Sequence, residues 1–213
     1  MLSYDLAHWS AFLTAAVLLN ISPGPDMAFI MGHTVRGGTR AGMAATFGVW
    51  TGAFGHVVMA ALGLSAVIAA SATAFAVVKW VGVAYLLWIG VRALLSKGGG
   101  LTLDDVPSGA RGDIWSVYRQ GVLIDLLNPK AAIFFLAFLP QFVVEGAGPV
   151  WVQLMVHGLL IILVAMFIEP PLVLLGDRLV VRLRDSRRLG LWLDRALGSL
   201  LIALGLRLAV EER

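Results

Sequence analysis

The chain has 213 residues, of which 59% are hydrophobic and only 14% are charged. A soluble domain carries about 25% charged residues, and a chain of this length cannot enclose so much apolar surface in water, so a lipid bilayer is indicated. The net charge of +3 does not indicate nucleic acid, because the arginines flank apolar stretches, and the absence of cysteine excludes disulfides and thiolate metal sites.

Six apolar segments are long enough to cross a bilayer, which takes about 20 helical residues. In chain order they are Trp9–Met31, Ala41–Ala70, Thr73–Leu95, Trp115–Val144, Val150–Leu175 and Leu191–Val210. Segments of this length satisfy their backbone in lipid only as helices, so the predicted fold is an all-α integral membrane protein of six transmembrane helices. A polar linker at 97–113 divides this single transmembrane domain, 1–213, into halves of three spans, about 1–96 and 114–213.

The basic residues predict the orientation of these spans. Lys and Arg gather in the connections after the first and fifth spans and around the central linker, and they are sparse on the opposite side. Because basic loops stay in the cytoplasm, both termini are predicted to face outward.

An odd number of spans in each half requires any repeat to be inverted across the membrane. Leu18-Leu19-Asn20 is followed by Pro23 in the first span, and Leu126-Leu127-Asn128 is followed by Pro129 in the fourth. Counted from opposite faces at about 1.5 Å per residue, Asn20 and Asn128 each lie roughly 16 Å into a core about 30 Å thick. The two motifs are therefore expected to meet near the midplane, as two inverted three-helix repeats.

Proline interrupts the helix at both motifs, since it lacks a backbone donor. The stretch Ser22-Pro23-Gly24-Pro25-Asp26 cannot continue a regular helix, and Pro129 falls at the corresponding place in the fourth span. Broken helices at matched positions of inverted halves are typical of secondary transporters, whose substrate site lies between them. A Pro kink that serves packing alone is the alternative interpretation.

These motifs resemble the LysE/RhtB family of amino-acid exporters. The resemblance is carried by Ser22 to Asp26 and by Leu126-Leu127-Asn128-Pro129-Lys130-Ala131-Ala132, with its continuation through Phe134 to Phe142. It covers about residues 10 to 210. It implies a multi-pass protein of the bacterial inner membrane that exports amino acids or homoserine lactones in a proton-linked manner. Asp125, where the family pattern commonly has Asn, and the sequence Glu169-Pro170-Pro171 are departures that bear on substrate and coupling.

Ionisable groups at membrane depth are costly, so five of them are candidates for substrate binding or proton coupling. They are Asp26, His56, Asp125, Lys130 and Glu169. Each has a structural alternative: a helix cap for Asp26, an ion pair for Asp125 with Lys130, a water-filled vestibule around Glu169, and a hydrogen bond between packed helices for His56. The functional interpretation places a substrate carboxylate on Lys130 and an amino group or a proton on Asp125.

The remaining conspicuous residues are expected to be structural. His8, His33 and His157 are interpreted as interface or packing residues, and Trp50 as part of the core. The glycines of the second span, Gly42 to Gly63, are expected to allow close helix packing within the chain or in a homo-oligomer.

The sequence thus predicts a proton-coupled exporter of amino acids or close derivatives such as homoserine, threonine, lysine or homoserine lactones. Its partners are a small-molecule substrate, protons and the lipid bilayer, without nucleic acid, metal or cofactor. A divalent-metal or small-amine exporter of the same fold is the alternative within transport, although the four histidines are scattered. An intramembrane enzyme is disfavoured, because neither HExxH nor GxSxG occurs.

Overall fold

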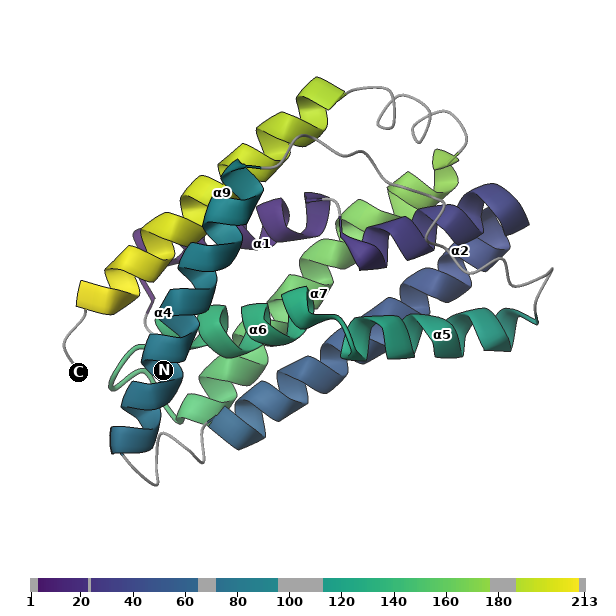
Figure 1. Cartoon of the computed structure of the whole chain (residues 1–213). Helices are drawn as coiled ribbons and strands as arrows, with labels where there is room; N and C mark the ends of the chain where they lie inside the picture. The colour runs from purple at the N-terminus through teal and green to yellow at the C-terminus, as the bar shows by residue number, and fades with distance from the viewer. Residues whose placement is uncertain (1–3, 23, 65–71, 96–112, 177–186, 211–213) are drawn as a thin grey trace.

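The computed structural model describes residues 4–22, 24–64, 72–95, 113–176 and 187–210, and within them every regular element is a helix (Figure 1). In chain order the elements are α1 (Leu6–Ile21), α2 (Pro25–Met59), η1 (Ala60–Leu64), α4 (Ala72–Leu94), α5 (Ile114–Leu126), α6 (Pro129–Phe138), η3 (Leu139–Phe142), α7 (Val150–Leu174) and α9 (Arg187–Val210). The all-helical prediction is confirmed for this part of the chain.

The first predicted span is interrupted between α1 and α2. The last turn of α1 closes with a hydrogen bond from the Ser22 amide to the Leu18 carbonyl, at 2.9 Å. Gly24 is the N-cap of α2 in extended backbone, and Pro25 occupies its first turn, where a missing amide hydrogen costs nothing. Pro23 lies outside the described residues. The helix therefore stops and restarts within the Ser22–Asp26 stretch.

A second feature of α2 is its sharp bend at Gly38, whose φ of 73° lies in the left-handed region that favours glycine. A Cβ on Gly42 would come within 2.1 Å of Thr34 Oγ1, so the residues on the two sides of the bend face each other. Figure 1 shows the two parts of α2 meeting at this bend. The connection expected between the first two spans is therefore a helical hairpin, with helix continuing almost to the turn.

The fourth predicted span is interrupted as well. Asp113 caps α5 by accepting from the Trp115 amide, and α5 ends at Leu126. The Asn128 amide then donates to the Asp125 carbonyl at 2.9 Å, and the Asn128 carbonyl accepts from Ala132 in the first turn of α6. Leu127 and Asn128 thus form a short link between two helices, directly before Pro129.

Glycines allow the closest helix contacts. A Cβ on Gly48 of α2 would lie 2.2 Å from the Tyr118 carbonyl oxygen of α5, and Gly121 packs against Gly48 from the other side. Gly90 of α4 and Gly198 of α9 face each other in the same manner. Small residues that let backbones approach are the usual basis of helix packing in membranes. The predicted packing role is confirmed for Gly48, whereas Gly63 has no described atom within 4 Å of its would-be Cβ.

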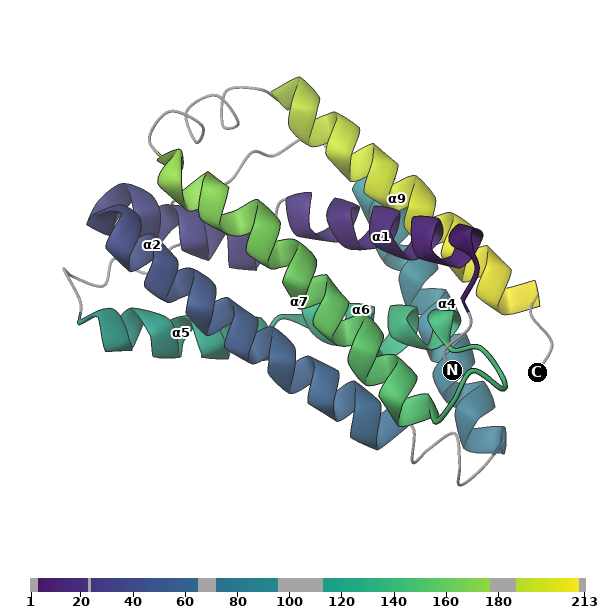
Figure 2. The same ribbon diagram turned by 180° about the vertical axis from the view of Figure 1, so that it is seen from behind.

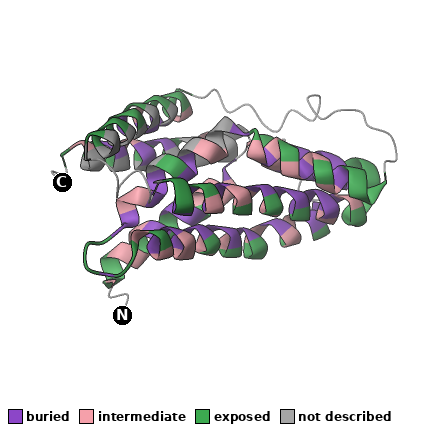
Figure 3. Cartoon of the chain, turned by 90° about the horizontal axis from the view of Figure 1, so that it is seen from below, coloured by how far each residue is buried: buried purple, intermediate pink, exposed green. Residues whose placement is uncertain are grey.

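The apolar residues divide into a core and an outer surface. Phe12, Phe138 and Leu154 are fully buried where α1, α6 and α7 meet. Large apolar side chains are also exposed around the outside, among them Phe167, Trp192 and Leu174. Figure 3 shows exposed residues along the outer faces of the helices and buried residues between them. Soluble monomers rarely expose this much apolar surface, so the outer faces suit lipid.

The predicted spans agree closely with the helices where both are described. Predicted Thr73–Leu95 corresponds to α4, and predicted Val150–Leu175 to α7. By length and composition, two of the described helices could cross a membrane unaided, Pro25–Gly63 and Val150–Leu174, and Leu6–Ile21 is a shorter apolar helix. Most of the predicted linker, 97–112, lies outside the described residues.

Candidate functional site

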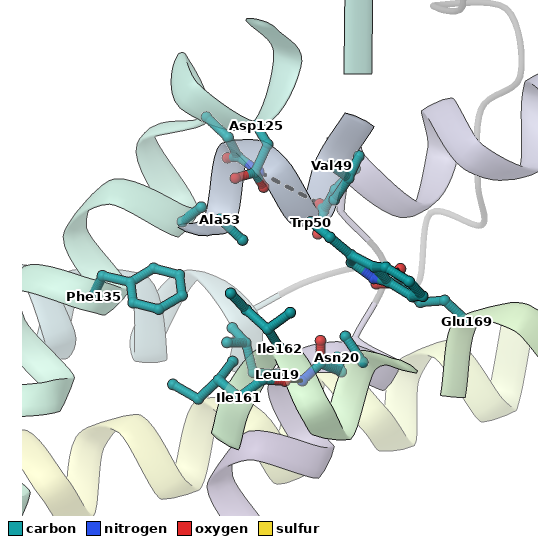
Figure 4. A pocket seen from close by; sticks show the side chains of 14 residues that line it. Leu19, Asn20, Val49, Trp50, Ala53, Asp125, Phe135, Ile161, Ile162 and Glu169 are labelled. Atoms are coloured by element: carbon teal, nitrogen blue, oxygen red, sulfur yellow. Dashed lines mark hydrogen bonds between the residues drawn. The ribbon is translucent and has the colours of Figure 1, made fainter. Parts of the chain in front are cut away.

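A pocket lies where the two helix interruptions approach each other (Figure 4). It contains about 490 Å³ of empty space, its opening included. We call it the central pocket. Its lining residues come from α1, α2, α5, α6, α7 and the α5–α6 link: Leu19, Asn20, Asp26, Val49, Trp50, Ala53, Asp125, Asn128, Ala131, Phe135, Ile161, Ile162, Ala165 and Glu169.

Asp125 is the carboxyl group best placed to receive a ligand. Its side chain is buried, and its Oδ2 has no hydrogen-bond partner among the described residues. His56 Nε2 lies 3.9 Å from that oxygen. It donates a hydrogen bond to the backbone carbonyl oxygen of Asp125, at 2.9 Å. A buried polar atom without a partner is rare and costly. The vacant oxygen is therefore available to accept a hydrogen bond from a ligand.

Glu169 lines the central pocket from α7 and has a partner. The indole nitrogen of Trp50 donates to Glu169 Oε2 at 2.8 Å, across the interface between α2 and α7. Glu169 is buried and precedes Pro170 and Pro171, both of which lie inside α7 without ending it. In the view of Figure 4, Phe135 and Glu169 lie at opposite ends of the central pocket.

The remaining polar lining comes from the interruptions themselves. Asn128 Nδ2 donates to Asp26 Oδ1 at 3.4 Å, which joins the α5–α6 link to the first turn of α2. Asn20 Nδ2 donates to the Ala16 carbonyl at 2.8 Å and to the Ile161 carbonyl of α7 at 3.4 Å. Both asparagines of the repeated Leu-Leu-Asn motif therefore line one pocket, and both of them contact another helix segment.

The central pocket includes five of the twelve residues proposed from sequence: Asn20, Asp26, Asp125, Asn128 and Glu169. Ser22, Gly24 and Pro25 shape the interruption without lining the pocket, and His56 lies behind Asp125. Asp26 is in the first turn of α2 and is not its N-cap, which is Gly24. Pro23 lies outside the described residues, as do the side chains of Pro129 and Lys130.

Several lining residues were missed by sequence reasoning. Trp50, interpreted as part of the core, does pack against the buried core, and it also lines the pocket and donates to Glu169. Phe135, Ile161 and Ile162 supply an apolar wall. Spacing gives no signal for Trp50, whose bond to Glu169 is a long-range contact, and the aliphatic residues are indistinguishable from lipid-facing neighbours.

The three acidic groups, Asp26, Asp125 and Glu169, lie within electrostatic range of one another. They are nevertheless spread over the pocket, and no group of three or more His, Asp or Glu residues that could hold a metal ion is found in the described ranges. No Lys or Arg is among the described lining side chains. The arrangement therefore suits an extended ligand with a positively charged end and an apolar part.

The bond between Trp50 and Glu169 gives a stability prediction. Trp50→Phe keeps most of the ring volume but removes the donor, so Oε2 of a buried carboxyl group loses its partner. We expect a loss of about 1–3 kcal/mol of unfolding free energy, measured by thermal unfolding in detergent. Trp151→Phe, at an exposed position, is the control and should change little; equal stability of both variants would show that the bond contributes nothing.

Known proteins are similar to this chain over almost its whole length. The profile of the LysE type translocator family matches residues 17–212. A homoserine/homoserine lactone efflux protein of Salmonella typhimurium is 29% identical over 201 residues, 94% of this chain and 95% of the relative. A leucine efflux protein of the same organism is 26% identical over 213 residues, 98% of each chain.

An uncharacterised membrane protein of Vibrio cholerae is 30% identical over 155 residues, 73% of this chain and 74% of the relative. No solved structure matches the chain. The family match covers both helix interruptions and every residue that lines the central pocket. The chain therefore belongs to the LysE type translocator family, and it is a membrane transporter and not an enzyme.

Proposed function

We propose that this transporter exports an amino acid or a close derivative across the bacterial inner membrane in exchange for protons. The observation that carries the proposal is the central pocket, in which two interrupted helices bring a vacant buried carboxyl oxygen together with an apolar wall. Relatives across the full chain length are named for efflux of homoserine, homoserine lactone and leucine. Homoserine, homoserine lactone and leucine are small molecules that share an amino group and differ in the rest of their structure.

The pocket chemistry matches the parts of such a substrate. A protonated amino group would donate to Asp125 Oδ2, the oxygen without a partner. The side chain would lie against Phe135, Ile161 and Ile162. A carboxylate would meet the amide groups at the starts of α2 and α6, where helix dipoles favour negative charge, and Lys130 at the start of α6 is the proposed cationic partner.

Six spans in two inverted repeats are part of this proposal. In such a repeat the first span packs on the fifth as the fourth packs on the second, and the third packs on the sixth. The contacts of α1 with α7, of α5 with the second part of α2, and of α4 with α9 support that pairing (Figures 1 and 2). Rocking of the two halves about the pocket would give alternating access, with both termini outside.

A small organic amine is the second candidate substrate. Three carboxyl groups line the central pocket, and no cationic side chain does so among the described lining residues. A cation without a carboxylate would satisfy the same Asp125 oxygen. The zwitterionic amino acid remains the primary proposal because the two helix starts offer amide groups for its carboxylate.

Glu169 is the proposed proton carrier, since one of its oxygens is held by Trp50 while Asp125 is left for the substrate. Glu169→Gln preserves shape but cannot exchange a proton. We therefore expect proteoliposomes with this variant to exchange labelled leucine or homoserine for unlabelled substrate at near-normal rates. Accumulation driven by a pH gradient should fall at least about tenfold, to the level of passive exchange.

The control for this experiment is Glu145→Gln, which changes an exposed carboxyl group in the loop before α7. It should leave both exchange and accumulation unchanged. If Glu169→Gln accumulated substrate as well as the unaltered protein did, Glu169 would not be the coupling group. Loss of exchange together with accumulation would instead place Glu169 in substrate binding.

A further inference from the structure

A second polar cluster joins α1 to α7 away from the three carboxyl groups. His8 Nε2 and His157 Nε2 lie 2.8 Å apart, within hydrogen-bond distance. His157 Nδ1 lies 2.8 Å from the Gln153 carbonyl oxygen, and Gln153 Oε1 accepts from the Tyr4 hydroxyl at 3.0 Å. We call these four residues the histidine lock. The sequence had indicated an interface or packing role for His8 and His157, and it gave no reason to single out Tyr4 or Gln153.

The contacts determine where the protons of the pair reside. A carbonyl oxygen only accepts, so His157 Nδ1 carries a proton, and its Nε2 is the acceptor in the neutral ring. His8 Nε2 is therefore the donor to His157. One added proton on His8 leaves this hydrogen bond intact. A second added proton, on His157 Nε2, places two N–H donors and two positive charges face to face at a distance that cannot hold them.

The surroundings hold both rings in register. Trp9 stacks on His157 with ring centroids 5.4 Å apart, and Phe12 meets His157 edge-on at 4.7 Å. Gln153 is itself fixed by bonds to the backbone of Val144 and Gly148. These aromatic contacts and backbone hydrogen bonds restrict rotation of the two imidazole rings. The rings therefore cannot turn apart while α1 and α7 stay in contact.

Few other titratable groups face the pair in the described part of the chain. Asp5 caps α1 by accepting from the His8 amide at 2.7 Å, so its carboxyl group lies at the same helix end. Tyr4 is on the same side, and burial raises the pKa of its hydroxyl, so it stays neutral over the range in which histidines titrate. From α7 only His157 itself is titratable at this contact, η3 contributes Phe142, and Glu145 is exposed in the loop.

The lock is connected to the pocket through the same two helices. His8, Phe12, Ala16 and Asn20 follow one another at four-residue intervals along α1, a spacing that keeps them on one side of a helix. The first two contact His157, and Asn20 donates to the Ile161 carbonyl. Figure 2 shows α1 crossing the molecule beside α7. Both helices line the central pocket, so releasing one end of α1 alters a pocket wall.

We propose that His8 and His157 form a second proton-binding site, a lock that holds the N-terminal end of α1 against α7 and opens when both imidazoles are protonated. This site is separate from the carboxyl groups of the central pocket, and its test needs no substrate. With the termini outside, it would respond to the pH of the outer compartment and couple acid there to movement of α1.

The test measures the separation of the two helix ends as a function of pH. The chain has no cysteine, so Leu6→Cys and Trp151→Cys, both at exposed positions, supply two sites for spin labels. In nanodiscs we expect one short distance population at pH 8. A second, longer population should grow as the pH falls below about 6 toward 4.5, because the second proton enters beside a positive charge and is therefore bound only below the ordinary range of a histidine.

Variants decide whether the pair causes the change. His8→Gln in the labelled protein should abolish the pH-dependent population, because a single remaining imidazole cannot produce the doubly charged pair. His33→Gln is the matched control, since His33 packs against Phe29 far from the lock, and it should retain the response. His8 is only partly buried, so its variant is expected to fold, which the elution profile in size exclusion verifies.

Two outcomes would overturn the proposal. The labelled protein with both histidines could show one unchanged distance from pH 8 to pH 4.5, in which case the contact is structural. Alternatively, His8→Gln could retain the long population at low pH, which would assign the response to another group. Loss of the response in His8→Gln and its retention in His33→Gln would support the lock whether or not the proposed substrate is correct.

Discussion

Asp125→Asn is expected to weaken binding of the transported substrate by about 10- to 100-fold. The substitution keeps the shape of the side chain and removes its charge, so a protonated amino group loses a charge-assisted hydrogen bond in a buried site. Such bonds contribute about 1.5–3 kcal/mol, and about 1.4 kcal/mol corresponds to a tenfold change in affinity. The measurement is equilibrium binding of labelled leucine and homoserine to purified protein in detergent.

The same exposed carboxyl control, Glu145→Gln, should bind as the unaltered protein does. The prediction concerns the vacant Oδ2 specifically, since His56 approaches it no closer than 3.9 Å and is engaged with the backbone carbonyl. An Asp125→Asn variant that is folded and binds with unchanged affinity would show that the ammonium group of the substrate lies elsewhere.

Gly48→Ala is expected to destabilise the protein strongly despite adding a single methyl group. The new Cβ would lie 2.2 Å from the Tyr118 carbonyl oxygen and 3.0 Å from Gly121 Cα, and both are backbone atoms that cannot turn away. Overpacking of this kind costs about 1–3 kcal/mol. For a chain of this size that corresponds to a melting temperature lower by roughly 2–12 °C, measured in detergent by size exclusion after heating.

Gly63→Ala provides the matched control within the same stretch of chain. No described atom lies within 4 Å of the Cβ that it adds. Alanine is also a better helix former than glycine by about 0.5–1 kcal/mol, so this variant should be as stable as the unaltered protein or more so. If the two alanine variants melted at the same temperature, the close contact of α2 with α5 at Gly48 would not be a determinant of stability.

The sequence predicted the helices well because lipid imposes a simple rule on composition. A run of about 20 apolar residues must be helical wherever it crosses a bilayer, so α4 and α7 could be placed within one residue. The interruptions near Pro23 and Pro129 were predicted for a local reason, namely the missing amide donor of proline. Neither prediction required knowledge of which helices pack together.

The residues of the site were predictable only in part, and charge explains the difference. Asp26, Asp125 and Glu169 are conspicuous because a carboxyl group is costly inside a membrane. Ile161 and Phe135 carry no such cost, so nothing in the sequence separates a pocket wall from a lipid-facing surface. The bond of Trp50 to Glu169 was not predicted because it depends on the approach of α2 to α7, a long-range contact.

The bend of α2 shows a similar limit. Arg36 and Arg40 lie in the basic connection that was predicted after the first span to face the cytoplasm. A single residue with positive φ is sufficient to reverse the chain, so the helix continues on both sides of Gly38. The histidine lock was equally hidden, since His8 and His157 are separated by 149 positions in the chain.

Transport by the purified protein tests the central claim most directly. Proteoliposomes would be given a panel of labelled amino acids, homoserine lactone and small amines, with and without an imposed pH gradient, beside empty liposomes and a control transporter. Gradient-dependent movement of one or a few amino acids or their derivatives, abolished by Asp125→Asn, is the result predicted here. If nothing bearing an amino group moved while the control transporter worked, the proposed substrate class and the role of the central pocket would both be contradicted.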